Sequence, residues 1–188
     1  MPLRRNKFKP GKGICLLAIA AIAGVALIAG QQFHEQPAEA SISTSSFFAA
    51  HAIDTEGAEQ ALAQWQGQIL VVNFWATWCA PCRTEMPELA ALSRQYAGRL
   101  TVLGISLDDS DQMRAFSAET PMPYPLLAAD VEGMSLSKSL GNSKSVVPHT
   151  VIIDSNGRIA GSFLGRISKA SLEESLLPLL TVSPISHQ

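Results

Sequence analysis

The chain has 188 residues, which is enough for one domain with short appendages. Five of its 14 Lys and Arg residues lie in the first 12 positions, where there is no acid. Everything beyond residue 30 therefore carries nine cationic residues against all 16 Asp and Glu, a net charge of −7 with His neutral. Because nucleic-acid backbones attract cationic surfaces, this balance excludes nucleic acid as the expected partner.

The N-terminus has the pattern of an export signal. The cationic head is followed by residues 14–30, an uncharged apolar run, and this order places the positive end in the cytoplasm. We therefore expect a signal or membrane-anchor helix over 1–30. Ala38 and Ala40 offer the small side chains of a cleavage site, whereas the length of the apolar run favours a retained anchor in the bacterial inner membrane. Either outcome places the remaining chain in the periplasm, where disulfides persist.

Composition divides the exported part into three segments. Residues 31–46 are polar and rich in Ser, Ala and Gln, which predicts a linker. We expect a folded domain over 47–182 and a C-terminal tail over 183–188.

Strand and helix patterns alternate along the expected domain. Short apolar runs rich in β-branched residues predict strands, and apolar residues at three- and four-residue steps predict helices. Such alternation, ending in a hairpin and a helix, favours an α/β fold with a mixed sheet and helices on both faces. The predicted strands are 47–53, 69–75, 100–107, 126–130, 151–154 and 158–164; the predicted helices are 56–65, 80–98, 111–119, 131–140 and 168–180.

Two cysteines lie where the buried strand 69–75 turns into a helix. Cys79 is expected at the first turn, exposed and with a lowered pKa, because unpaired N–H groups and the helix dipole stabilise a thiolate there. Cys82, three residues on, can approach it within disulfide range while being less exposed. Pro81 is tolerated in a first turn because its missing N–H would have no partner. The spacing predicts a reversible disulfide in which Cys79 attacks and Cys82 resolves.

Two other roles are open to a cysteine pair, a structural disulfide and a zinc site. A structural disulfide across two intervening residues closes a very short loop and therefore stabilises little. A zinc site needs about four ligands, and no second cysteine pair is present. The four histidines also lack ligand spacing: His34, His51, His149 and His187.

The residues around the pair resemble a known active site. Asn73-Phe-Trp-Ala-Thr-Trp-Cys-Ala-Pro-Cys-Arg-Thr-Glu-Met-Pro87 resembles that of the thioredoxin superfamily, and more narrowly that of its TlpA/ResA-like, membrane-tethered thiol–disulfide oxidoreductases. The resemblance covers about residues 47–180. It implies a thioredoxin fold, in which 108–141 resembles the central βα insertion of the narrower branch.

Glu85 lies one helical turn beyond Cys82, on the same side of the helix. The resemblance implies that this carboxyl takes part in thiol proton transfer, and partial burial would raise its pKa for that role. The alternative is a surface glutamate that merely repels a thiolate. Asn73 stands where ordinary thioredoxins have a buried Asp, which makes Glu85 the more plausible proton acceptor.

The resemblance also implies a substrate-binding surface. Pro148 matches the cis-proline that packs opposite the cysteines in the thioredoxin fold and borders the groove where a substrate chain pairs its backbone. Trp78 and Val147 are expected to line the same groove. His149 follows this proline; it either tunes the thiolate or contacts substrate, or it is a solvent-facing side chain on a strand edge, which we favour.

The resemblance implies reduction of protein disulfides, as in cytochrome c maturation, with electrons from a membrane thiol–disulfide donor. No metal or organic cofactor is expected. Three alternatives stay open: a disulfide-donating oxidase, a thiol peroxidase, and a non-catalytic partner-binding module.

Overall fold

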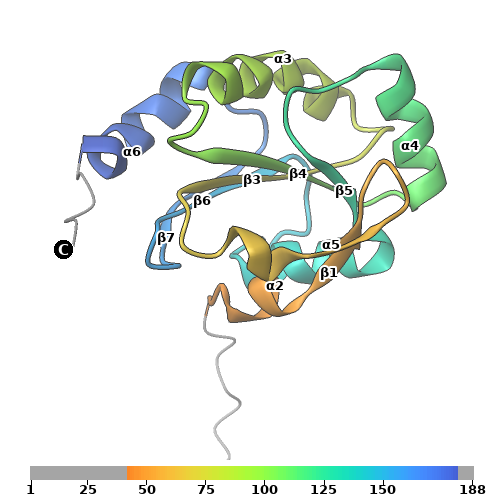
Figure 1. Cartoon of the computed structure of the whole chain (residues 1–188), viewed down its shortest axis with the longest axis horizontal. Coiled ribbons are helices and arrows are strands. Elements are labelled where there is room, and N and C mark those ends of the chain that lie inside the picture. Colours follow the sequence, from red (N-terminus) through yellow and green to blue (C-terminus); the bar gives the residue numbers. More distant parts are fainter. Residues whose placement is uncertain (1–41, 182–188) are drawn as a thin grey trace, which may run out of the picture. The chain divides into compact units, whose positions relative to one another are not determined.

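The computed structural model describes residues 42–181, and its centre is a mixed β-sheet (Figure 1). The order of the strands is β2-β1-β5-β4-β3-β6-β7. Strands β3, β4 and β5 run parallel, whereas β6 is antiparallel to β3 and β7 is antiparallel to β6. The strands are β1 (His51–Ile53), β2 (Glu59–Ala61), β3 (Leu70–Trp75), β4 (Thr101–Ser106), β5 (Leu126–Ala128), β6 (His149–Ile153) and β7 (Ile159–Leu164).

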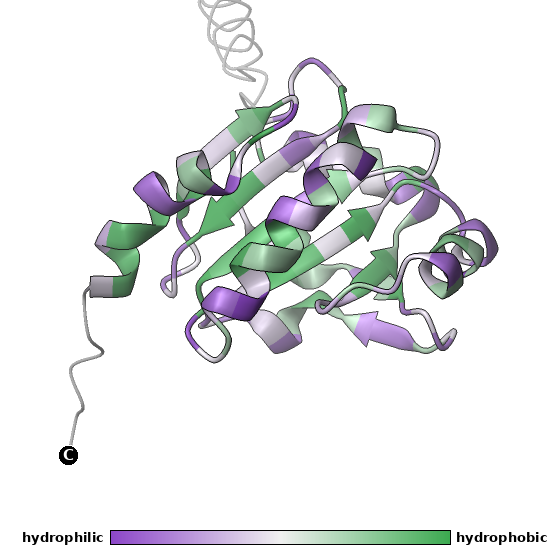
Figure 2. Ribbon diagram, turned by 90° about the horizontal axis from the view of Figure 1, so that it is seen from above, coloured by the Kyte–Doolittle hydropathy of each residue, from purple (hydrophilic) through white to green (hydrophobic). Residues whose placement is uncertain are grey.

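Helices cover both faces of the sheet. Figure 1 shows α3 and α6 on one face and α2 and α5 on the other. Apolar side chains of the sheet face both layers, so the strands are mostly hydrophobic in Figure 2 while the helices alternate hydrophobic and hydrophilic residues. The helices are α2 (Ser45–Ala49), the 3-10 helix η1 (Leu62–Trp65), α3 (Ala80–Gln95), α4 (Ser110–Glu119), α5 (Asp130–Ser139) and α6 (Lys169–Thr181).

β3 is buried on both faces because it lies between β4 and β6 under helices on each side. Since side chains of a strand alternate, its residues divide between two cores. Leu70, Val72 and Phe74 belong to the core under α2 and α5. Val71 and Trp75 belong to the core under α3 and α6. Asn73, which lies between these two, therefore faces α3.

The central and C-terminal elements agree with the sequence predictions. The strands predicted at 69–75, 100–107, 126–130, 151–154 and 158–164 are β3 to β7, with ends shifted by a few residues. The four helices predicted after the cysteines are α3 to α6. The hairpin expected between the last two predicted strands is also present, with Gly157 at φ 77° and its N–H donated to the carbonyl of Asp154. The mixed α/β fold is thus confirmed.

The first two predicted elements are partly wrong. Residues 45–49 form the helix α2, which buries Phe47 and Phe48 against the sheet, and only 51–53 form the strand. Two adjacent aromatic residues in so short a run do not distinguish a helical from a strand period.

The helix predicted at 56–65 is instead strand β2 followed by η1. The Asp54 carboxylate accepts N–H groups of Glu56 and Ala58, and Gly57 adopts φ 87°, which closes a hairpin with β1. Pairing with β1 overrides the helix propensity of these residues. Trp65 is half-buried and packs against the core under α2 and α5.

Several expectations lie outside the described residues. They are the signal or anchor helix at 1–30, most of the linker at 31–46, and the tail at 183–188. Within residues 42–181, none of the helices combines the length and hydropathy needed to cross a bilayer.

Candidate active site

Cys79 and Cys82 form a disulfide at the point where β3 passes into α3. Their Cα atoms are 5.3 Å apart and their sulfur atoms 2.06 Å apart. Cys79 is the N-cap residue of α3, and its Sγ accepts the backbone N–H of Cys82 at 3.2 Å. Pro81 occupies the first helical turn, as expected. One of the orphan donors of the helix N-terminus is therefore directed at the sulfur of Cys79.

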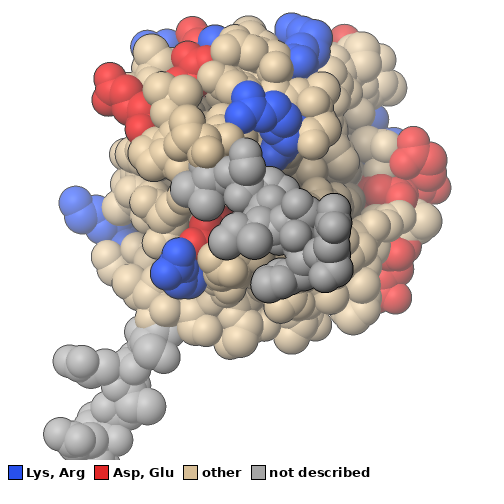
Figure 3. Space-filling model, turned by 60° about the vertical axis from the view of Figure 1, so that its left-hand side comes forward, with Lys and Arg blue, Asp and Glu red and all other residues tan. Residues whose placement is uncertain are grey.

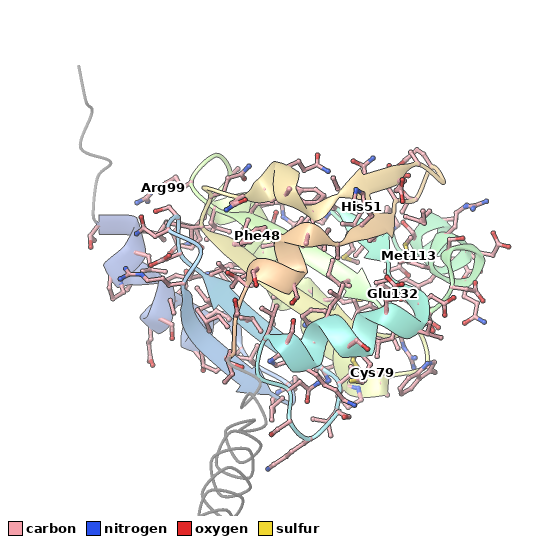
Figure 4. All side chains as sticks on the ribbon, turned by 90° about the horizontal axis from the view of Figure 1, so that it is seen from below. Phe48, His51, Cys79, Arg99, Met113 and Glu132 are labelled. Atoms are coloured by element: carbon pink, nitrogen blue, oxygen red, sulfur yellow. A yellow bond between two sulfur atoms is a disulfide. The ribbon has the colours of Figure 1, made fainter. Side chains whose placement is uncertain are left out.

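The exposure predicted for Cys79 is wrong. Only 5% of Cys79 is accessible, and Cys82 is fully buried, so the expected order of exposure is correct but both sulfurs lie in the core under α3. As the N-cap residue, Cys79 packs in the core against the first turn of α3. Its neighbour Trp78 is 69% exposed and provides the large apolar surface beside the disulfide. Figure 4 shows Cys79 at the end of the sheet.

Asp108 holds the loop that precedes the disulfide. Its carboxylate accepts the backbone N–H of Thr77 at 2.7 Å and the Thr77 hydroxyl at 3.1 Å. Ser106 donates its hydroxyl to the same carboxylate at 2.8 Å. No motif in the sequence marks Asp108 as part of the site. The sequence does contain one indication of its position. Asp108 follows β4, and because β3 and β4 are parallel, their carboxyl ends lie at the same edge of the sheet as the cysteines.

Glu85 is fully buried on the side of α3 that faces the sheet, so it is not the surface glutamate of the alternative interpretation. Asn73 donates from Nδ2 to its Oε1 at 2.6 Å, and the N–H of Ile167 donates to its Oε2 at 3.1 Å. Asn73 also donates to the hydroxyl of Thr150 at 3.0 Å. Burial raises the pKa of Glu85 to about 7, against the lowering effect of the two hydrogen bonds and the charge of Arg166. The carboxyl can therefore gain or lose a proton near neutral pH.

The Val147–Pro148 peptide bond is cis, which confirms the expected isomer. It lies directly before β6, whose first residue pairs with Phe74 near the end of β3. The carbonyl of Pro148 accepts the N–H of Gly165, which ties the start of β6 to the end of β7. Val147 is half-buried, and Val146 is 39% exposed. The cis bond thus begins the strand next to the one that delivers the cysteines.

The solvent-facing position favoured for His149 is wrong. The side chain is fully buried, because β7 covers the edge of β6 and α5 covers its face. It lies in the layer of Phe74, on which its ring stacks at 5.7 Å between centroids, and so on the face opposite Asn73. Ser137 and Ser162 contact Nδ1 and Nε2 at 2.8 and 3.0 Å. Burial lowers its pKa to about 4.

On the face of the domain seen in Figure 3, both acidic and basic side chains are present, and uncharged residues separate them. Within residues 42–181, no group of three or more His, Cys, Asp or Glu side chains is placed to hold a metal ion. The titratable and redox groups that the structure places at this site are the Cys79–Cys82 disulfide and the buried carboxyl of Glu85.

A Cys-x-x-Cys disulfide at a helix N-terminus, next to a cis-proline, defines a thioredoxin-like thiol–disulfide protein. Residues 44–162 match the model of the AhpC/TSA family, and the chain belongs to this family.

Named relatives agree with this class. The chain is 36% identical over 115 residues to the thiol:disulfide interchange protein HelX of Rhodobacter capsulatus, covering 61% of this chain and 62% of HelX. It is 28% identical over 165 residues to the thiol-disulfide oxidoreductase ResA of Bacillus cereus, covering 87% of this chain and 91% of ResA. The structure of a secreted thiol-disulfide isomerase from Corynebacterium glutamicum superposes with a TM-score of 0.62, at 28% identity, over 70% of this chain and 83% of that one. The chain is accordingly a thiol–disulfide oxidoreductase.

Proposed function

We propose that the chain reduces disulfides of periplasmic proteins, with apocytochromes c as the physiological class of substrate. The observation that carries this proposal is the N–H of Cys82 directed at the Cys79 sulfur at the N-terminus of α3. A donor in this position stabilises the thiolate form, which is the attacking species. The relatives named as thiol:disulfide interchange proteins and ResA support the reaction type.

The reaction runs in two exchange steps. In the first, the Cys79 thiolate attacks one sulfur of the substrate disulfide, so that a mixed disulfide forms and the other substrate sulfur leaves as a thiolate. In the second, the Cys82 thiolate attacks the Cys79 sulfur, which closes the Cys79–Cys82 bond and releases the second substrate thiolate. The substrate gains two electrons and two protons, and the chain is oxidised from dithiol to disulfide.

Glu85 is proposed to move the proton of Cys82. Its carboxyl lies one helical turn from Cys82, and its pKa of about 7 lets it accept the thiol proton before the second step. Asn73 and Ile167 hold the two carboxyl oxygens, so the group is fixed in place. A membrane thiol–disulfide carrier then returns the chain to the dithiol form.

Substrate is proposed to bind across the exposed Trp78 and along the segment that leads into β6, in which Val147 is half-buried and Pro148 is buried. Trp78, Val147 and the cis-proline Pro148 lie on the segments that flank the cysteines. The cationic and apolar pattern of residues 1–30 supports a periplasmic location with the chain tethered to the inner membrane. The folded domain is proposed to span 47–182.

The experiment is to measure the reduction potential of the Cys79–Cys82 pair in the full chain, by equilibration with defined thiol buffers. A reduction potential of about −270 mV, as in thioredoxin, supports the proposal that the chain is a reductant. A value near about −120 mV, typical of a strong disulfide donor, contradicts the proposed direction and makes the chain an oxidase.

Substrate exchange is tested with Cys82→Ser, which keeps the attacking thiol and should trap a mixed disulfide with a reducible protein substrate. Cys79→Ser is the matched control, since it should form none. If neither variant nor the native chain exchanges with any disulfide, the proposed function is wrong.

A further inference from the structure

A buried hydrogen-bonded network links His149 to the exposed segment before the cis-proline. Asn142 accepts the N–H of Val146 at its Oδ1 (3.1 Å) and donates from Nδ2 to the carbonyl of the same residue (2.7 Å). Asn142 Nδ2 also donates to the hydroxyl of Ser137 at 2.8 Å. The Ser137 hydroxyl contacts Nδ1 of His149 at 2.8 Å. Ser137, Asn142 and His149 are each fully buried, and we call them the His149 network.

The contacts with Val146 fix the orientation of the Asn142 amide. Both backbone groups of Val146 face the Asn142 amide, so its oxygen and nitrogen cannot be exchanged without losing two hydrogen bonds. Ser137 therefore accepts from Asn142, and its own hydroxyl hydrogen has His149 Nδ1 as its acceptor. With this hydrogen directed at Nδ1, we assign the neutral tautomer in which His149 carries its hydrogen on Nε2, within hydrogen-bond distance of the Ser162 hydroxyl.

The network closes a ring through the main chain. From His149 the backbone leads through Pro148 and Val147 to Val146, whose two backbone groups are held by Asn142. The short segment between these two anchors is therefore fixed at both ends. It follows the exposed residues 143–145, where Ser145 has φ 53°, a conformation that a serine rarely adopts without support from its surroundings.

We propose that His149 is a positioning residue, which acts through Ser137 and Asn142 to hold residues 146–148 in the conformation that receives the substrate backbone. This inference rests on the proposed function for the identity of the substrate surface. The side chain of His149 lies on the sheet face opposite Asn73 and Glu85, so His149 does not take part in the proton transfer assigned to Glu85. A segment held in its bound conformation loses less conformational entropy on binding, so the network should lower KM for a polypeptide substrate.

Two neighbouring serines provide a matched test in the full chain. Ser137→Ala removes the connection between the imidazole and Asn142, whereas Ser162→Ala removes only the partner of Nε2 and leaves the connection to Val146 in place. The reduced protein is assayed with insulin, a polypeptide disulfide, and with 5,5′-dithiobis(2-nitrobenzoate), a small disulfide that needs no backbone pairing.

We expect Ser137→Ala to raise KM for insulin about tenfold with little change in kcat, the loss associated with one buried hydrogen bond. The rate with the small disulfide should stay at the native value, and Ser162→Ala should keep the native KM. An unchanged KM for insulin in Ser137→Ala overturns the proposal. An equal loss with both disulfides also overturns it, since that would be a general disruption of the fold.

A second measurement reads the network without substrate. Nitrogen NMR of the native protein should show the His149 hydrogen on Nε2, and hydrogen exchange of the Val146 N–H should be faster in Ser137→Ala but not in Ser162→Ala. An Nδ1–H tautomer, or equal exchange in both variants, overturns the proposal. If the native chain reduces no disulfide, the proposed function fails while this measurement still decides the network.

Discussion

Glu85 and His149 are both fully buried, and they lie on opposite faces of the same sheet. Glu85 accepts a hydrogen bond from Asn73, and His149 stacks on Phe74, so two consecutive residues of β3 carry the two groups on its two faces. Burial disfavours the charged form of each, which raises the pKa of Glu85 to about 7 and lowers that of His149 to about 4. The two groups therefore change stability in opposite directions as the pH rises.

The first prediction concerns this opposition. Between pH 4.5 and 6.5, folded Glu85 keeps a proton that the unfolded chain has lost, so its contribution to the unfolding free energy falls as the pH rises. Over the same range the unfolded chain protonates His149 and the folded chain does not, so that contribution rises with pH. The unfolding free energy of Glu85→Gln, relative to that of the native chain, should therefore rise by about 2 kcal/mol between these two pH values. His149→Gln should lose a similar amount.

Urea unfolding at three pH values across this range measures the change. Other titrating groups contribute equally to native and variant proteins, so only the difference between them is compared. His51→Gln is the control for the loss of a histidine, because His51 is exposed on β1 and lies outside both buried environments. Parallel pH profiles for all four proteins would contradict both assignments.

The second prediction concerns Asp108. Asp108→Ala removes the acceptor for the N–H and hydroxyl of Thr77 and for the hydroxyl of Ser106, all of which lie near the disulfide loop. Leaving buried donors without a partner should lower the unfolding free energy by about 1–3 kcal/mol. The loosened loop should also slow thiol exchange at Cys79, measured with a small disulfide.

Asp109→Ala is the matched control for Asp108. Asp109 caps α4 by accepting the N–H of Gln112, and losing a cap costs about 1 kcal/mol. It should leave the exchange rate at the native value. Equal exchange rates in the two variants would show that Asp108 does not position the loop.

The third prediction contrasts two glycines. A Cβ at Gly104 would lie 2.6 Å from Cδ2 of Leu126 and 3.2 Å from Nε1 of Trp75, so Gly104→Ala should be destabilised by about 1–3 kcal/mol through overpacking. A Cβ at Gly133, inside α5, would have its nearest neighbour at 3.4 Å, so Gly133→Ala should be stabilised by up to about 1 kcal/mol through helix propensity. Thermal unfolding of both variants measures the sign, and a shift of Tm in the same direction would refute the contrast.

The fourth prediction concerns Trp78. Because this side chain is 69% exposed, Trp78→Ala should change the unfolding free energy by less than about 0.5 kcal/mol. If Trp78 contacts substrate, its loss should raise KM for a polypeptide disulfide about tenfold or more, as for an aromatic anchor of an interface. Val131→Ala, which truncates an 82% exposed apolar residue on α5, should leave KM unchanged. A native KM in Trp78→Ala would remove this residue from the substrate surface.

The sequence by itself determined the strand, turn and helix around the cysteines and most elements after them. These depend on local patterns: an uncharged β-branched run, a proline in the first helical turn, and the Ser155-Asn-Gly157 turn. The resemblance of residues 73–87 to the thioredoxin active site added the cis isomer of Pro148, which the structure confirms.

Only the tertiary structure decided the environments of the buried polar groups. Glu85 is held by Asn73 from β3 and by Ile167, 82 residues further along the chain, and no local pattern contains that distance. His149 is buried because β7 pairs alongside β6 and α5 packs over it, whereas the sequence alone allowed an edge position. Likewise, residues 59–61 form a strand because β1 offers hydrogen-bond partners to them. Local sequence specifies periodicity and turns, but the choice of neighbours depends on packing between segments that are far apart in the chain.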